Sequence, residues 1–199
     1  MRPAARLAAA LVIGASAAFG NPAAAGGLTA GQRAEIEGMR AGPMAKLLVH
    51  AEPKDRSALS FQRPGGGDTD VSEFAGQVTV LNLWATWCPP CIHEMPALDR
   101  LSKAMEGSGV RIVTLNVERG GLEKAAEFLE RNMLHNLQAY ADERAAVPRA
   151  IGALGLPTTI ILDPEGREIA RVQGDAAWDE SPAPEVLRRL AEMTGATGG

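Results

Sequence analysis

The hydrophobic and polar positions of the chain form short apolar runs separated by segments with a helical period. Residues 78–84 (VTVLNLW) are β-rich and almost continuously apolar, and residues 110–117 (VRIVTLNV) are a second candidate for a buried strand. Such runs predict strands that are buried on both faces of a sheet. Residues 158–162 and 169–172 predict two further strands, joined by a hairpin turn at residues 163–166 (DPEG).

Apolar positions that recur with the period of an α-helix predict the remaining elements. Four helices follow from this spacing: one that begins at the cysteine loop and runs to about Met105, one over residues 122–133, one over residues 147–154, and one that Ser181 caps and that runs to about Met193. Residues 58–62 are a further, short strand candidate, followed by a turn or loose loop at residues 64–68 (PGGGD).

The order of these elements is strand, helix, strand, helix, helix, hairpin and helix. Helical connections between strands indicate parallel crossovers, and the hairpin is expected to add an antiparallel edge. The predicted fold is therefore an α/β domain over residues 57–195, with a central mixed β-sheet and helices on both faces. Residues 26–56 are predicted to form a helical extension that packs against this domain.

Within the predicted extension, the helical period runs over residues 28–50. Thr29 is a candidate for the cap at its start, and Gly42-Pro43 should kink or split the helix.

Residues 1–25 have the pattern of a secretory signal peptide. Arg2 and Arg6 are basic, residues 7–19 are apolar and uncharged, and residues 23–25 (AAA) offer a cleavage site. An uncleaved membrane anchor is the alternative, although an apolar stretch of 13 residues is shorter than the roughly 20 that span a bilayer. In either case we expect the rest of the chain to be exported, to the periplasm of a bacterium.

Composition narrows the possible functions. The chain has 199 residues, which suits one ordinary domain with an extension, and we expect a monomer. Its formal net charge of -4 argues against a nucleic-acid-binding surface, and we expect no nucleic-acid partner. The chain holds two cysteines, Cys88 and Cys91. They are too few for a cysteine-rich zinc module, and the loop between them is too small to staple a fold, so the pair needs a chemical explanation.

The position of Cys88 suits disulfide exchange. It follows a buried strand and stands at the start of a helix, where free N–H groups and the helix dipole stabilise a thiolate. The thiolate is the attacking species in exchange. Cys91 lies one helical turn further on, within reach of a mixed disulfide at Cys88. Pro89 and Pro90 suit the first turn and stiffen the loop.

Haem attachment, a zinc site and a copper site are the other uses of such a cysteine pair. A c-type haem attachment needs His directly after the second cysteine, where Ile92 stands. Zinc would need two more ligands, and the three histidines are scattered. A Cu(I) site formed by Cys88 and Cys91, with or without His93, is chemically reasonable and is kept as the alternative. We expect a catalytic dithiol, with no metal and no cofactor beyond the redox-active disulfide.

Several neighbours of the dithiol are candidate site residues. Glu94 is either a buried carboxyl that exchanges protons with Cys91, or a surface residue in a first turn that favours acids. Pro157 opens a predicted strand and is a candidate cis-proline, with an ordinary trans peptide as the alternative. Trp87 is expected to cover the rim of the site, and Trp178 is expected to be a packing residue.

These motifs resemble the thioredoxin-like proteins, and more narrowly the TlpA/ResA/CcmG group of exported reductases, with the greatest similarity to TlpA. The residues that carry the resemblance are, in chain order, 81–91 (LNLWATWCPPC), 94–98 (EMPAL), 155–159 (GLPTT) and 163–166 (DPEG).

The resemblance implies roles for individual residues. Cys88 matches the attacking thiol, Cys91 the resolving thiol and Glu94 the buried acidic residue of the group. Pro157 matches the cis-proline of the substrate site, to which we assign Trp87 and Leu156 as well. Asn82 stands where cytoplasmic thioredoxin has a buried Asp. His93 and Pro90 depart from the pattern, which leaves the redox potential open.

The resemblance also implies partners. The expected clients are oxidised cysteine pairs in cytochrome c or cytochrome oxidase maturation, namely apocytochrome c, copper-delivery proteins or oxidase subunits. A membrane electron donor of the DsbD/CcdA type is expected to keep the protein reduced.

Overall fold

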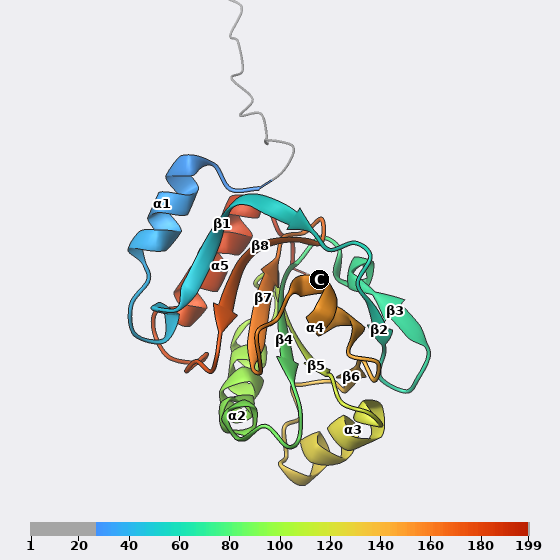
Figure 1. The fold of residues 1–199 in the computed structure, drawn as a ribbon. Helices are drawn as coiled ribbons and strands as arrows, with labels where there is room; N and C mark the ends of the chain where they lie inside the picture. The colour runs from blue at the N-terminus through green and yellow to red at the C-terminus, as the bar shows by residue number, and fades with distance from the viewer. Residues whose placement is uncertain (1–26, 199) are drawn as a thin grey trace, which may run out of the picture.

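The computed structural model describes residues 27–198. The predicted signal peptide, residues 1–25, and the first residue of the predicted extension, Gly26, lie outside the described residues. The described residues form an eight-stranded sheet with helices on both faces (Figure 1). The predicted α/β fold with a central mixed sheet is confirmed.

The elements have the following bounds. The strands are β1 (Leu47–Asp55), β2 (Ser60–Gln62), β3 (Asp68–Asp70), β4 (Val78–Trp84), β5 (Val110–Asn116), β6 (Tyr140–Ala141), β7 (Thr158–Leu162) and β8 (Arg167–Gln173). The helices are α1 (Ala30–Gly38), α2 (Pro89–Ala104), α3 (Gly121–Arg131), α4 (Ala146–Ile151) and α5 (Ala183–Thr194), with 3-10 turns η1 (Gly42–Met44) and η2 (Val71–Phe74). Across the sheet the order is β1-β8-β7-β4-β5-β6-β2-β3.

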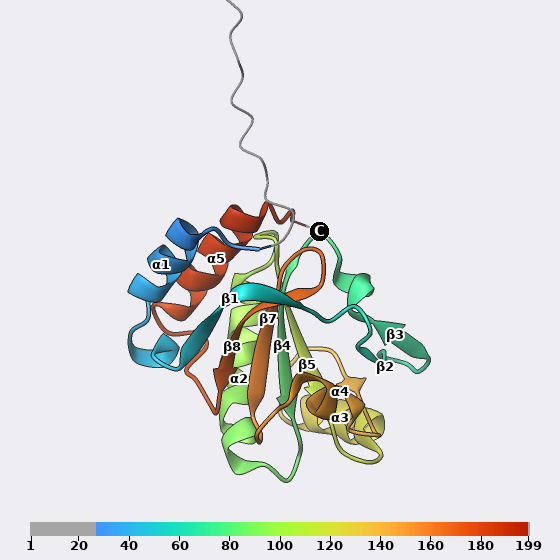
Figure 2. The same cartoon turned by 45° about the horizontal axis from the view of Figure 1, so that its top comes forward.

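The central strand β4 is buried along its whole length, as its apolar sequence predicts. It pairs in parallel with β5 and antiparallel with β7. Because side chains alternate along a strand, Val80 enters one apolar cluster and Leu81 the other. The first cluster includes residues of α1, α2, α3 and α5, whereas the second includes residues of α4, η2 and β2. Helices α1 and α5 lie side by side (Figures 1 and 2).

The predicted helix over residues 28–50 is wrong at its C-terminal end. Thr29 caps α1 with a capping box as predicted, but the helix ends at Gly38. Strand β1 begins at Leu47 and pairs antiparallel with β8. Leu47 and Val49 are buried while Leu48 between them is half exposed, which is the alternation of a strand. This part of the predicted extension is therefore a strand of the central sheet.

Three smaller differences concern the sheet and the last helix. The predicted hairpin of β7 and β8 is present, but it lies inside the sheet because β1 covers β8. Ser181 does not cap α5, whose first residues follow a cis peptide between Ser181 and Pro182. Strands β3 and β6 are short elements that the hydrophobic pattern did not predict. Within residues 27–198, no helix is both long and apolar enough to cross a bilayer.

Candidate active site

The two cysteines lie where β4 passes into α2. The strand ends at Trp84, and a short loop leads to Cys88, which is the N-cap residue of α2. Pro89 occupies the first turn of the helix. N–H groups in that turn have no partner within the helix, so the missing N–H group of proline costs no hydrogen bond. The backbone N–H of Cys91 points to Cys88 Sγ at 3.3 Å. The strand-to-helix placement predicted from the sequence is confirmed.

The cysteines form a disulfide, with Cα atoms 5.3 Å apart. Cys88 is 4% exposed and Cys91 is fully buried, so Cys88 is the sulfur nearer to solvent. A thiolate at Cys88 would stand at the N-terminus of a 16-residue helix, where the dipole and the free N–H groups stabilise negative charge. The geometry therefore gives the two sulfurs unequal access, as a stepwise exchange requires.

Pro157 directly precedes β7, the strand that pairs with β4. Thr158, the first residue of β7, pairs with Leu83 near the end of β4, so Pro157 lies at the sheet end from which the cysteine loop departs. The Leu156–Pro157 peptide is cis, which confirms that the candidate proline is a cis-proline. Leu156 is half-buried and contacts both apolar clusters.

Large apolar side chains are exposed on both chain segments that meet at this end of the sheet. Trp87, directly before Cys88, is 67% exposed, and Ile92, directly after Cys91, is also exposed. Leu154, three residues before Pro157, is 90% exposed. Trp87 therefore projects into solvent next to the dithiol, where an incoming polypeptide can contact it.

Glu94 is buried, as the first of its two interpretations predicted. It is 2% exposed and accepts hydrogen bonds from three N–H groups: Asn82 Nδ2 at 2.7 Å, the backbone N of Ala176 at 3.1 Å and Trp178 Nε1 at 3.0 Å. Burial raises the pKa of Glu94 to about 7, against the opposing effect of these donors. A carboxyl with this pKa can both accept and release a proton at neutral pH.

Asn82 connects Glu94 to the sheet. Its Nδ2 donates to Glu94 Oε1 and to Thr159 Oγ1 at 2.9 Å, while its buried Oδ1 has no donor in the described structure. Since Asn82 pairs with Thr159 across β4 and β7, the two strands fix the amide from both sides. Asn82 therefore occupies a buried polar position without being able to titrate.

A second carboxylate supports the loop that carries Cys88. Glu118 follows β5, and its Oε1 accepts from the backbone N of Thr86 at 2.8 Å. Lys124 Nζ donates to Glu118 Oε2 at 3.0 Å. Burial alone would raise the pKa of Glu118, but the hydrogen bonds from Thr86, Lys124 and Asn116 outweigh it and hold the pKa below its usual value. The ionised form of Glu118 thus anchors the loop.

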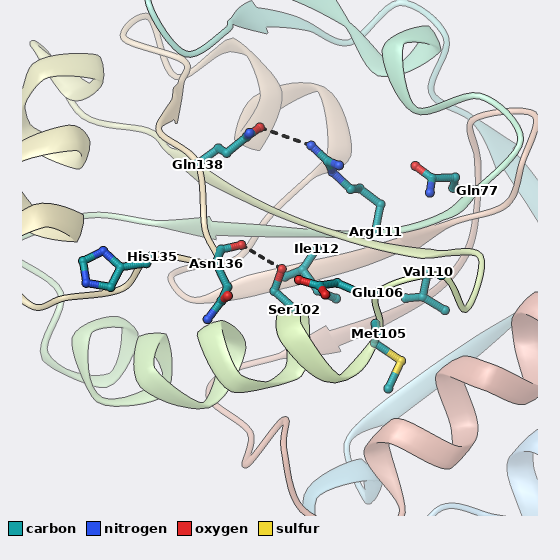
Figure 3. Close-up of a pocket in the computed structure, with 11 residues that line it drawn as sticks. Gln77, Ser102, Met105, Glu106, Val110, Arg111, Ile112, His135, Asn136 and Gln138 are labelled. Carbon is teal, nitrogen blue, oxygen red and sulfur yellow. Dashed lines mark hydrogen bonds between the residues drawn. The ribbon is translucent and has the colours of Figure 1, made fainter. Parts of the chain in front are cut away.

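One cavity borders Glu94 and another lies far from the dithiol. A groove of about 540 Å³ between η1, α2 and the loop after β8 is lined by His93 and Glu94, but by neither cysteine. Exposed His93 thus faces a groove that borders Glu94. Figure 3 shows a second cavity of about 380 Å³, lined by Val110 at the start of β5 and by the C-terminal end of α2. It lies at the opposite end of the sheet from the dithiol.

The structure also bears on the metal alternatives. Among the residues that it describes, no three His, Cys, Asp or Glu side chains are grouped to hold a metal ion. The histidines are separated: His50 lies beside Glu168 on the β1–β8 pair, and His135 lines the cavity of Figure 3.

Sequence reasoning missed three residues of this site. The donors Ala176 and Trp178 come from a loop more than 80 positions away from Glu94, and Glu118 reaches Thr86 from the segment after β5. Trp178 was expected to pack, and it is fully buried, but its indole N–H also binds Glu94. The only sequence signal for a role of Trp178 at the site was its position after Gly174, beyond a predicted strand.

A thioredoxin-like fold with a disulfide at the start of a helix defines a class of thiol–disulfide exchange proteins. Residues 53–187 match the Redoxin family. The chain belongs to this family, and within it to the TlpA/ResA/CcmG group of thiol-disulfide oxidoreductases.

Curated relatives support this assignment. Thiol:disulfide interchange protein DsbE of Pseudomonas aeruginosa is 31% identical over 138 residues, which cover 67% of this chain and 72% of the relative. Thiol-disulfide oxidoreductase ResA of Bacillus subtilis is 30% identical over 124 residues, which cover 62% and 68%.

Solved structures show the same fold. A secreted thiol-disulfide isomerase from Corynebacterium glutamicum matches with a TM-score of 0.61 at 22% identity, covering 74% of this chain and 92% of that one. StoA from Bacillus subtilis matches with a TM-score of 0.53 at 22% identity, covering 69% and 99%.

Proposed function

We propose that the protein is a periplasmic reductant of client disulfides in cytochrome c or cytochrome oxidase maturation, and that it acts as a monomer. The observation that carries this proposal is the pairing of a Cys88–Cys91 disulfide at a helix start with a buried Glu94 whose pKa is raised to about 7. The clients are oxidised cysteine pairs of apocytochrome c, a copper-delivery protein or an oxidase subunit. A donor of the DsbD/CcdA type in the membrane returns the protein to its dithiol form.

The reaction proceeds in two exchange steps. The Cys88 thiolate attacks one sulfur of the client disulfide, which forms a mixed disulfide and releases the other client sulfur as a thiolate. Cys91 then gives its proton to the Glu94 carboxylate and attacks Cys88 Sγ. The client leaves with two reduced sulfurs, the protein is left with the Cys88–Cys91 disulfide, and Glu94 passes the proton on to solvent or to the departing thiolate.

Variants of the two cysteines test the order of these steps. Cys91→Ser should accumulate the mixed disulfide with an oxidised client peptide, whereas Cys88→Ser should form none. Non-reducing electrophoresis and mass spectrometry measure both outcomes. Turnover at the wild-type rate by both variants would exclude the dithiol mechanism.

The direction of electron flow needs an equilibrium measurement. A glutathione redox titration should give a potential more reducing than about −200 mV, the range in which a dithiol donates electrons to client disulfides. A much more oxidising value would assign the protein to disulfide formation instead.

Anaerobic Cu(I) titration of the reduced protein tests the alternative function. Tight stoichiometric binding without reductase activity would favour a copper-binding module.

The choice of client can be tested with peptides. A disulfide-bonded Cys-x-x-Cys-His peptide, which represents apocytochrome c, should be reduced faster than a peptide of the same length and charge whose cysteines have another spacing. Equal rates would contradict apocytochrome c as the preferred client while leaving the exchange activity intact.

A further inference from the structure

A buried charged cluster joins β1 and β8 on the side of the sheet that carries α4. At its centre, Glu168 of β8 has no exposed surface. Its carboxylate contacts His50 Nε2 at 2.7 Å, Arg56 Nε at 2.8 Å and Arg171 Nε at 2.6 Å. A buried carboxylate is tolerated only when such partners satisfy it.

The two arginines provide the positive charge of this cluster. Burial alone would raise the pKa of Glu168, but the hydrogen bonds from His50, Arg56 and Arg171 outweigh it and hold the pKa below its usual value. Burial lowers the pKa of His50, so its imidazole is neutral at neutral pH. Glu168 therefore faces two guanidinium groups and one neutral ring, with Lys54 as a further cation near His50.

Each guanidinium group also binds the end of α4. Arg56 Nη1 donates to the carbonyl O of Ala150 at 3.4 Å, and Arg171 Nη2 donates to the carbonyl O of Ile151 at 3.1 Å. These are the last two carbonyls of the helix, which have no partner within it. A planar guanidinium can bind a carboxylate and a carbonyl at once because its donors point in fixed directions.

The segment that follows α4 leads to Pro157, at the end of the sheet from which the cysteine loop departs. The helix ends at Ile151, and the residues after it include exposed Leu154 and the cis Leu156–Pro157 peptide. Thr158 then pairs with Leu83 at the end of β4. The anchored end of α4 is thus six residues from Pro157.

We propose that Glu168 is a positioning residue for the substrate loop, defined as residues 152–157. It orients Arg56 and Arg171, which hold the last carbonyls of α4 and so fix where the loop begins. The N-terminal strand β1 leads into Arg56 and supplies His50, so this strand takes part in shaping the substrate site. The proposal rests on thiol–disulfide exchange with the substrate at Pro157, and it is independent of which client is used.

The test compares a polypeptide disulfide with a small one. Arg171→Lys keeps a positive charge beside Glu168 but lacks the fork that reaches Ile151. We expect the reduced variant to react with insulin about tenfold more slowly than the wild type, because a displaced loop misplaces the polypeptide. Its rate with glutathione disulfide and its redox potential should change less than about twofold, since a small disulfide needs little loop contact. Glu168→Gln should show the same split, and Arg171→Lys keeps the test valid if Glu168→Gln does not fold.

A purely structural role would give a different result. Arg189→Lys is the control, because Arg189 makes an exposed ion pair with Glu35 between α5 and α1, and it should leave both rates unchanged. Equal loss of both rates in Arg171→Lys, or loss of neither, would overturn the proposal.

Amide hydrogen exchange tests the anchoring without a substrate. The N–H of Ala153 donates to the carbonyl O of Pro148 at 2.9 Å, and it should exchange at least about tenfold faster in Arg171→Lys. Unchanged exchange would contradict the proposed anchoring. Faster exchange with an unchanged insulin rate would instead place the substrate contact away from this loop, which separates failure of the positioning role from failure of exchange itself.

Discussion

Trp178 Nε1 donates a hydrogen bond to Glu94 Oε2 across 3.0 Å, which joins the loop after β8 to the helix that carries the dithiol. Both side chains are buried, and the backbone N of Ala176 binds the same oxygen. The charge of Glu94 is therefore controlled by a segment that is far from the cysteines in sequence.

Removal of the indole N–H should raise the pKa of Glu94. In Trp178→Phe the ionised carboxylate loses one donor, and a hydrogen bond to a charged group corresponds to about one pKa unit. Trp84→Phe is the matched control, since Trp84 is equally buried but its Nε1 has no partner in the described structure. NMR titration of the Glu94 carboxyl measures both variants. Equal shifts in the two would mean that ring volume, rather than the hydrogen bond, sets the pKa.

Glu94→Gln should change the pH dependence of exchange. If Glu94 accepts the proton of Cys91, the rate of resolution in the wild type should rise with an apparent pKa near 7, and the variant should lose this transition. Stopped-flow measurement of client release between pH 5 and pH 9 checks this. An identical profile in the variant would exclude Glu94 from the proton transfer.

The same carboxyl should make folding stability depend on pH. The pKa of Glu94 is raised from 4.5 to about 7 in the folded state, so folding takes up a proton between these values. Its contribution to stability is therefore full below pH 4.5 and is lost as the pH rises through 7. Relative to Glu94→Gln, the free energy of unfolding of the oxidised wild type should fall by up to about 3 kcal/mol over this range. Denaturant titrations at pH 5 and pH 8 measure the difference, and a constant difference would contradict the raised pKa.

Glu118→Leu should loosen the loop that carries Cys88. The N–H of half-buried Thr86 would lose its acceptor, which costs about 1 kcal/mol of folding free energy. We expect a lower melting temperature and a slower reaction with clients, with Glu106→Leu as the control because the ion pair of Glu106 with Lys103 is exposed. A melting temperature that is the same in the two variants would show that the loop does not depend on Glu118.

Trp87→Ala should weaken client binding without changing stability. The ring is 67% exposed beside Cys88, so its removal from the free protein costs little, within about 0.5 kcal/mol. Aromatic side chains dominate binding at such sites, and we expect about a tenfold rise in KM for a polypeptide disulfide. Leu48→Ala is the control, since Leu48 is exposed on β1, at the edge of the sheet. Equal KM values for Trp87→Ala and the wild type would remove Trp87 from the substrate site.

The parts of the fold that sequence could predict are those in which one local pattern decides the structure. The apolar run 78–84 is strand β4 with the same bounds, and the cysteine pair after it begins α2. The predicted helix wrongly includes Leu47 and Leu48, because two adjacent apolar residues fit a helix face as well as a strand. Only pairing with β8 decides between these, and it leaves Leu48 in solvent.

The environment of Glu94 could not be predicted for a related reason. Spacing places it one turn beyond Cys91, but its burial depends on Trp178 and Ala176, which tertiary folding brings to it. Glu168 gave no signal at all, because its partners His50 and Arg56 lie more than 110 positions earlier.

Strand β1 has one more consequence, which concerns aggregation. It is the outermost strand on its side of the sheet, and its pairing with β8 is irregular between Val49 and Lys54. Pro53 in this stretch has no N–H to offer to another strand. Lysine, proline and irregular pairing are the features by which edge strands avoid adding further chains. This edge of the sheet is thus unsuited to capturing extended polypeptides by strand addition.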